Sequence, residues 1–472
     1  MSTPDHAPFC ERLFTLGSVE LDATFQWPAG LPPLEGTCYW NGPGRFARGD
    51  VRYRNWLDGD GLVCALRLGG GQVRFTARFV RSAKFTGEES AGRPLFRTFG
   101  TAFAGDQLKR GIGLESPVNV SVYQVGARLL AFGEQGLPWQ IDPETLDTRE
   151  IFTFDGQLNE ITPFSAHPKL DPETGEMFNF GVMFSAERPT LNVYRFAPDG
   201  SLTYRRRLPL PFAASMHDFA LSRRHAIFQV SPYILDMAAL LREGATIIDA
   251  LIWQPELGSR LFVVSRENGE LAAEIPVGHG YCLHLVNAFE QDDALIVDLV
   301  EYERPIYDQY QVIPDLFTDV STAAPVRLTL DLPGQRVVNR RTLDYRSAPD
   351  FPSHDAALTG RPYEDFWMLG ISATGRPGRK FFDELVHASW DRDRVGVYKV
   401  PSGQYLGGEP LVLPDPSDPS RPIVVCQRHD AEAVATSFVF FDGRRVADGP
   451  IATLDLGAAI PASFHSTYVS RA

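Results

Sequence analysis

The sequence predicts an all-β fold of many short strands, which three observations support. Turn sequences recur along the chain, for example at 58–61, 198–200 and 268–269. Between them lie short segments rich in β-branched and aromatic residues, such as 73–80 and 226–230. This pattern is typical of a sandwich, a barrel or a propeller. The length of 472 residues favours a propeller, because a sandwich rarely needs so many strands.

The composition is that of an ordinary globular protein, with 44% hydrophobic and 22% charged residues. The formal net charge of -14 argues against a nucleic acid partner, because phosphate binding needs a basic face. We find no nucleotide-binding loop and no hydrolase nucleophile elbow. Composition and motifs therefore exclude several common function classes.

The cysteines and the N-terminal sequence indicate a reducing compartment. The five cysteines are odd in number, and no two have the spacing of a metal or redox motif. Residues 1–9 lack a basic stretch followed by an apolar one, and no run of 18 apolar residues occurs. We expect a cytoplasmic protein that is peripheral to a membrane at most.

Residues 232–253 depart from the strand pattern. Their apolar spacing predicts two short amphipathic helices, broken near Gly244 and inserted between strands. One interpretation is a lid packed on the sheet, and the other is an apolar mouth that meets a membrane or an oily substrate. The apolar residues of this insertion are Ile234, Leu235, Leu240, Leu241, Ile247, Ile248, Leu251 and Trp253.

Four of the ten histidines stand in well-defined contexts: His167, His217, His284 and His465. Their separations of 50, 67 and 181 residues exclude a local metal motif. A propeller blade takes about 40–50 residues, so inner strands of different blades could bring all four imidazoles to the central axis. Imidazole is a good ligand for iron, copper, zinc or nickel. Each histidine alone could equally be a structural residue.

These motifs resemble those of the carotenoid cleavage oxygenases. The resemblance covers nearly the whole chain, from Asn41-Gly42-Pro43 and the 56–61 segment through the histidine motifs to Phe464-His465. It implies a single domain over residues 1–472, a seven-bladed β-propeller with short helical insertions capping an iron-bearing face. It also implies that His167, His217, His284 and His465 hold iron(II), and that His284 is preferred to the neighbouring His279.

The family places carboxylates against the ligand histidines, where they fix the tautomer and orientation of the ring. Glu134 and Glu409 match two of these positions, and Asp350 stands where the third is normally glutamate. Because aspartate is one methylene shorter, we expect its hydrogen bond to be lost or mediated by water. Val120 occupies the position of a threonine that crowds the vacant iron site in many members.

The resemblance implies an oxidoreductase that uses Fe2+ and O2, without an organic cofactor, to cleave a C=C bond into aldehyde or ketone products. Stilbene-cleaving members hold a phenol through a lysine and a tyrosine, but Gly133 and Phe99 stand at these positions. Burying an unpaired phenol costs about 1–3 kcal/mol. We therefore expect an apolar carotenoid or apocarotenoid substrate. The alternatives are a stilbene-cleaving dioxygenase and a non-catalytic carotenoid-binding propeller. The tunnel and any membrane-facing surface are expected to include Phe99, Ile234, Leu235, Leu240, Leu241 and Trp253.

Overall fold

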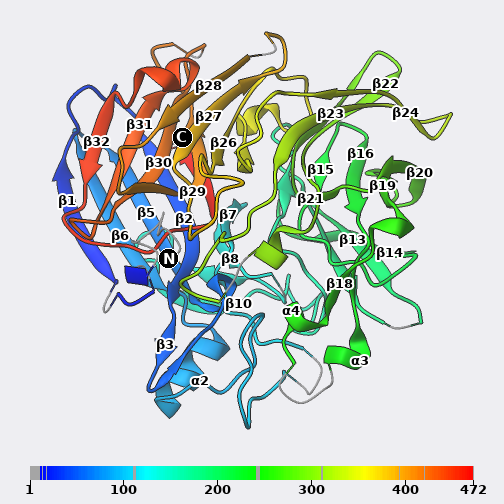
Figure 1. Cartoon of the computed structure of the whole chain (residues 1–472), viewed down its shortest axis with the longest axis horizontal. Coiled ribbons are helices and arrows are strands. Elements are labelled where there is room, and N and C mark those ends of the chain that lie inside the picture. Colours follow the sequence, from blue (N-terminus) through cyan, green and yellow to red (C-terminus); the bar gives the residue numbers. More distant parts are fainter. Residues whose placement is uncertain are drawn as a thin grey trace.

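A computed structural model describes residues 11–12, 14–16, 19–109, 113–134, 136–185, 187–240, 245–309, 312–392, 394–418 and 420–470. Within these residues, seven antiparallel sheets of four or five strands surround a common centre (Figure 1). The structure is thus a seven-bladed β-propeller, and the predicted fold class is confirmed.

The first blade joins the two ends of the described chain, and Figure 1 shows its blue strands beside red ones. Its strand order is β1 (Leu21–Gln26), β6 (Gln72–Phe79), β5 (Asp60–Gly69), β2 (Gly36–Arg45) and β33 (His465–Ser470). β33 pairs with β2 from Asn41↔His465 to Gly36↔Ser470. The last strand therefore closes the ring against an early one.

The other blades follow in chain order. The second blade consists of β10 (Thr148–Ile151), β9 (Trp139–Ile141), β8 (Arg128–Phe132) and β7 (Ser121–Val125). The third blade consists of β11 (Lys169–Leu170), β12 (Met177–Met183), β13 (Thr190–Phe196) and β14 (Leu202–Pro209). The fourth blade consists of β15 (Ala220–Leu221), β16 (His225–Val230), β19 (Ser259–Ser265) and β20 (Leu271–Gly278). The fifth blade consists of β21 (Tyr281–Gln291), β22 (Ala294–Tyr302), β23 (Ala323–Asp331) and β24 (Arg336–Thr342). The sixth blade consists of β25 (Asp350–Ser353), β26 (Asp365–Gly370), β27 (Glu384–Ser389) and β28 (Arg394–Lys399). The seventh blade consists of β29 (Gln404–Leu413), β30 (Ile423–Asp430), β31 (Ala435–Asp442) and β32 (Ala452–Asp455).

One strand of each blade faces the centre. β33 contacts β7 and β29, β29 contacts β25, β25 contacts β21, and β21 contacts β15. Such inner strands are covered on both faces, so β21 is buried along nine consecutive residues. Residues of outer strands alternate between a more buried and a more exposed face, as in β1 and β20. Residues at the start of an inner strand therefore lie near the axis.

Separate apolar clusters join neighbouring blades. Leu261 and Ile275 of the fourth blade pack with Leu299 and Leu328 of the fifth, for example. Burial of apolar area contributes about 25 cal/mol per Å², so each interface between blades stabilises the ring. A further large cluster lies under the loops and insertions at one end of the propeller, and it includes Phe351 and Phe464.

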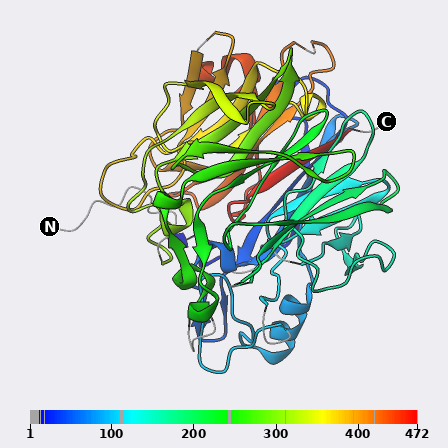
Figure 2. The same ribbon diagram turned by 90° about the vertical axis from the view of Figure 1, so that its right-hand side faces the viewer.

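Helices and short ribbons gather at that end of the molecule (Figures 1 and 2). They are α2 (Ala83–Ala91), α3 (Met237–Leu240), α4 (Ile247–Ala250), and the ribbons β3 (Ala47–Arg48) with β4 (Val51–Arg52) and β17 (Tyr233–Leu235) with β18 (Leu251–Trp253). Short 3-10 segments occur at Trp56–Asp58, Pro255–Leu257, Ile306–Gln309, Ala356–Leu358 and Gly443–Asp448, the last with a kink at Arg445. No described helix is long and apolar enough to cross a membrane.

The insertion at 232–253 contains the two predicted helices, α3 and α4, flanked by β17 and β18. Its apolar residues mostly face inward: Leu235 and Leu240 are 5% exposed and belong to the large cluster under the loops. Ile234 and Trp253 are half-buried, and Leu241 and Gly244 lie outside the described residues. Because Leu235 and Leu240 are buried, they do not face a membrane, and the described part of the insertion packs against the protein.

The described cysteines agree with a reduced protein. Cys38, Cys64, Cys282 and Cys426 are buried free thiols, and Cys10 lies outside the described residues. Burial raises the pKa of Cys64 to about 12, so this thiol is inert at neutral pH.

Candidate metal centre

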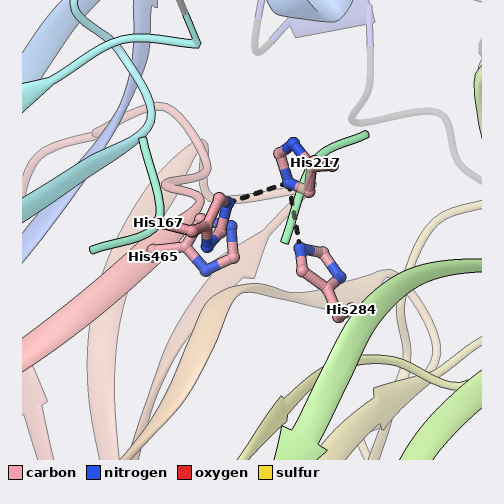
Figure 3. A group of neighbouring side chains, drawn as sticks. All are labelled: His167, His217, His284 and His465. Atoms are coloured by element: carbon pink, nitrogen blue, oxygen red, sulfur yellow. Dashed lines mark hydrogen bonds between the residues drawn. The ribbon is translucent and has the colours of Figure 1, made fainter. Parts of the chain in front are cut away.

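Four histidines meet on the axis because each lies at or beside the inner strand of a different blade. His465 begins β33 and His284 belongs to β21. His167 precedes β11 by two residues, and His217 precedes β15 by three. Figure 3 shows the four rings converging. The structure therefore brings together all four histidines singled out in the sequence.

The four rings are close enough to share one ion. The Nε2 atoms of His167 and His217 are 2.9 Å apart, and those of His217 and His284 are 3.2 Å apart (Figure 3). One ligand nitrogen from each of the four lies within 4.8 Å of the others. His167, His284 and His465 are buried and His217 is half-buried. His279, by contrast, is exposed and its Nδ1 contacts the Pro255 carbonyl at 2.6 Å.

Two carboxylates contact the outer nitrogens of these rings directly. Glu134 Oε2 lies 2.9 Å from His217 Nδ1, and Asp350 Oδ1 lies 2.6 Å from His284 Nδ1. The expectation that aspartate is too short for direct contact is therefore wrong. β25 shifts register just after Asp350, and Phe351 has a left-handed backbone with a φ of 53°. This irregular backbone brings the shorter side chain within reach.

The third predicted carboxylate makes a longer contact. Glu409 Oε2 lies 3.6 Å from His465 Nδ1 and accepts a hydrogen bond of 3.0 Å from the backbone N–H of Ser466. The main chain of this segment is held as well, since Glu409 N donates to Phe464 O at 2.6 Å. Glu409 therefore contacts the backbone beside His465 more closely than it contacts the imidazole ring of His465.

A fourth carboxylate, Asp218, was not singled out in the sequence. Its Oδ1 lies 3.7 Å from His167 Nδ1 and 2.8 Å from Lys169 Nζ, and its Oδ2 accepts the backbone N–H of Leu285 at 3.0 Å. Asp218 follows the ligand candidate His217 but faces another histidine. An acidic residue directly after a ligand histidine is the signal that could have identified it.

The surroundings control the charge of the rings. Burial and the neighbouring histidines lower the pKa of His167 well below its usual value. Burial also lowers the pKa of His465, although Glu409 opposes this effect. Burial acts on His284 in the same direction, but Asp350 outweighs it and raises the pKa of that ring. Neutral imidazole, the form that binds metal, is therefore favoured at His167 and His465.

The donor set fits a metal ion. A carboxylate beside Nδ1 keeps the hydrogen on that atom, so the Nε2 lone pairs face one another. Lone pairs at 2.9 Å repel unless a cation lies between them. An imidazole–metal bond of about 2.1 Å separates adjacent ligand nitrogens by about 3.0 Å, close to the 2.9 and 3.2 Å found here. Four neutral nitrogen donors suit iron, copper, nickel or zinc.

A cavity, which we call the axial pocket, opens beside the histidines. It is lined by Leu57, Thr98, Phe99, Leu114, Glu115, Ser116, Pro117, Asn119, Val120, Glu134, His217, Leu283, His284, Tyr307, Phe351, Phe464 and His465. Phe99 and Val120 thus lie on its wall, as their predicted roles require, whereas Ile234, Leu235, Leu240 and Trp253 do not line it. Most of its wall is apolar, which favours an oily ligand.

Tyr307 and Glu115 are among the polar side chains of the axial pocket that the sequence alone did not indicate. The hydroxyl of Tyr307 lies 3.2 Å from His217 Nδ1, and its ring meets Phe99 edge-on at 5.2 Å. Glu115 also lines the wall and is paired with Lys109. No motif surrounds either residue, so only the folded structure identifies them.

Comparison with known proteins gives a consistent result. The family model described as retinal pigment epithelial membrane protein matches residues 27–470. Isoeugenol monooxygenase of Pseudomonas putida is 30% identical over 436 residues, covering 89% of this chain and 88% of the relative. Resveratrol cleavage oxygenase 1 of Aspergillus fumigatus is 32% identical over 379 residues, covering 76% and 74%. A solved structure of a Synechocystis apocarotenoid oxygenase variant superposes with a TM-score of 0.88 at 25% identity, covering 99% of this chain and all of that one.

Proposed function

The chain belongs to the family of retinal pigment epithelial membrane protein and the carotenoid cleavage oxygenases, and from this premise we propose that it is a non-haem iron(II) dioxygenase. In the proposed reaction, the two atoms of O2 are added to the carbons of one C=C bond, which breaks to give two carbonyl groups. The observation that carries the proposal is the convergence of four histidine nitrogens within 4.8 Å beside an apolar pocket.

Bound iron(II) would supply the redox chemistry that activates dioxygen towards an alkene. The protein's own groups hold and shield the reacting centre. His167, His217, His284 and His465 would hold the ion through neutral nitrogens. Asp350 keeps His284 in the metal-binding tautomer by a hydrogen bond, and the Glu134 carboxylate lies 2.9 Å from His217 Nδ1, where it favours the same tautomer. The apolar walls of the axial pocket bind the substrate and exclude water.

We propose a carotenoid or apocarotenoid as the substrate. Leu57, Phe99, Leu114 and Leu283 provide apolar wall for a polyene chain. Gly133 stands where stilbene-cleaving members have a lysine, and a Cβ added there would lie 2.0 Å from the Ser116 hydroxyl oxygen, so a side chain at this position would require Ser116 to move. The two phenol-binding groups of those enzymes are therefore both missing.

A phenolic aryl alkene is the second candidate, and Tyr307 favours it. Its hydroxyl on the wall of the axial pocket offers a polar contact that the predicted tunnel did not include. The relatives named for isoeugenol and resveratrol add support. The third candidate is a carotenoid-binding propeller without turnover. Membrane contact and a cytoplasmic location stay predictions; within the insertion, Ile252 offers an apolar side chain that is 44% exposed.

Anaerobic reconstitution with iron(II), followed by air and a substrate panel, tests the proposal. The panel holds β-carotene, apo-8′-carotenal and resveratrol, with products identified by mass spectrometry. Aldehydes from the apocarotenoid are the expected result, and their masses locate the scissile bond. Products from resveratrol alone would favour the second candidate. No product from any compound, with iron at full occupancy, would favour the binding protein.

A further inference from the structure

Glu115 is a charged side chain in the axial pocket that the proposed reaction does not use. The residue is 9% exposed and lines the same cavity as His217, His284 and His465. Its neighbour Leu114 belongs to the apolar part of the wall. A carboxylate in such surroundings is costly unless it is paired and hydrogen-bonded. Its presence on this wall therefore calls for a function.

Lys109 compensates one side of this carboxylate. Its Nζ lies 3.1 Å from Glu115 Oε1. Lys109 is held in place by two backbone hydrogen bonds with Gly113, of 2.7 and 3.1 Å. Among the residues that the structure describes, no donor reaches the second oxygen, Oε2. Glu115 can therefore accept one more hydrogen bond, from a ligand.

We propose that Glu115 is a specificity-determining residue that accepts a hydrogen bond from a hydroxyl group of the substrate. This inference rests on the proposed function, because it assumes that the axial pocket binds the substrate. It narrows the substrate class to alkenes that carry a hydroxyl group, either a ring alcohol on a polyene or a phenol on an aryl alkene.

A hydroxyl group is a better fit than a plain hydrocarbon for a simple reason. An analogue without the hydroxyl fills the pocket but leaves Oε2 without a donor and without water. Sites that hydrogen-bond a substrate hydroxyl reject such analogues strongly. Lys109 satisfies Oε1 with either ligand, so only the hydrogen bond to Oε2 differs between them. We therefore expect the hydroxylated ligand to bind about tenfold or more tightly than its analogue without the hydroxyl.

Binding of matched pairs tests this proposal independently of turnover. The pairs are 3-hydroxy-β-apo-8′-carotenal against β-apo-8′-carotenal, and resveratrol against trans-stilbene. Dissociation constants are measured anaerobically with the iron-loaded enzyme, so that no substrate is consumed. The wild type should prefer the hydroxylated member of one pair by about tenfold or more. The pair that shows the preference distinguishes the ring alcohol from the phenol.

Three variants complete the experiment. Glu115→Leu should reduce the preference to about onefold, and Glu115→Gln, which keeps a neutral acceptor, should reduce it by about threefold or more. Glu160→Gln is the matched control, because Glu160 also faces Lys109, at 3.8 Å, but does not line the pocket. It should leave the preference unchanged.

A wild type without preference in either pair would overturn the inference, as would an unchanged preference in Glu115→Leu. If Glu115→Leu fails to fold, a Glu115→Gln variant of normal melting temperature with undiminished preference would overturn it equally. A preference that depends on Glu115 without cleavage of any compound would count against the proposed function alone. Cleavage with a preference independent of Glu115 would count against this inference alone.

Discussion

Asp218 connects three groups around the axis, the His167 ring, the Lys169 ammonium and the Leu285 amide. Its carboxylate is buried, yet its pKa is lowered: burial raises the pKa, but the positive Lys169 together with His284 and His217 outweighs burial. Asp218 therefore stays ionised at neutral pH and orients His167 from behind. The three other histidines have their own carboxylates, so Asp218 completes the set.

Asp218→Asn should weaken iron binding, because asparagine keeps the size of the side chain but loses the charge that fixes His167. Losing such an outer partner typically costs about 10–100-fold in metal affinity. Competition with a chelator measures the iron affinity, and a thermal melt checks the fold. Glu173→Gln, an exposed change nearby, should have no effect. Wild-type iron affinity in a folded Asp218→Asn protein would contradict this role.

At this scale, the sequence identified residues that carry a motif and missed those that do not. The four histidines were predictable because each has a characteristic local context, and the resemblance supplied Glu134 and Glu409. Asp218, Glu115 and Tyr307 meet their partners only after distant blades pack together. The contact between Asp350 and His284 depends on the irregular backbone at Phe351. The length of the aspartate side chain alone could not predict this contact.

One buried arginine, Arg97, ties the insertion to the segment that carries Phe99. Arg97 Nη1 donates to the carbonyls of Leu240 at 3.3 Å and Ala245 at 3.0 Å, and its guanidinium pairs with Asp106 at 3.0 Å. Phe99, two residues on, lines the axial pocket and accepts a hydrogen bond from Ile248 N at 3.3 Å. The position of the insertion and the shape of the pocket are therefore linked.

Arg97→Gln should loosen the insertion without affecting the metal centre. The loss of these charge-assisted hydrogen bonds should lower local protection by about 1–3 kcal/mol. Hydrogen exchange over 236–240 and 245–251 measures it, and iron content should stay at the wild-type level. Arg206→Gln, which removes an exposed hydrogen bond to Asn268 O, is the control. Unchanged exchange in the insertion would show that Arg97 does not hold it.

Local sequence predicted the two helices of the insertion but not its surroundings. The apolar spacing and Gly244 indicated α3 and α4. Residues 233–235 and 251–253 pair instead as β17 and β18, because the two ends of the insertion meet. Which apolar residues are buried depends on remote partners such as Phe317 in the same cluster. Periodicity cannot identify these partners.

Glu290 joins the fourth and fifth blades. Its carboxylate accepts hydrogen bonds from Ser222 Oγ at 2.7 Å and from the backbone N–H groups of Arg223 and Arg224, and it lies 3.1 Å from His225 Nδ1. Although burial raises its pKa, His225, Ser222 and these backbone groups outweigh burial and lower it to about 2. Glu290, six residues after His284, therefore has a structural role between the two blades.

The pH dependence of stability should reveal this contact. A carboxylate whose pKa is lower in the folded than in the unfolded protein stabilises the fold above about pH 4.3, and this contribution is lost as pH falls towards 2. Glu290→Gln should cost about 1–3 kcal/mol at pH 7 and much less near pH 2. Urea unfolding at both pH values measures the difference. An equal cost at the two values would contradict the proposed ionic contact.

At the scale of the whole molecule, β33 both closes the ring and supplies His465. The general class of fold followed from short strands and recurrent turns, whereas the number of blades came from the resemblance alone. Blade sequences here lack visible repetition, because each inter-blade cluster is packed with different side chains. Closure by a strand from the far end of the chain likewise leaves no local signal.

Closure and metal binding can be separated by two variants. Removing residues 465–472 should lower Tm by about 5 °C or more, because β2 becomes an unpaired edge and the ring opens. His465→Ala keeps β33 and should retain the fold while losing iron. Circular dichroism and thermal melts of both proteins check this. A truncated protein with wild-type Tm would show that β33 contributes little to closure.

The central claim is that the four axial histidines hold the iron on which cleavage depends, and His217→Ala tests it most directly. The measurement is iron per chain after anaerobic reconstitution, with product formation from the substrate panel in the same samples. We predict one iron per chain and turnover for the wild type and for the control His279→Ala, and neither for His217→Ala. Full iron and undiminished cleavage in His217→Ala would contradict the claim.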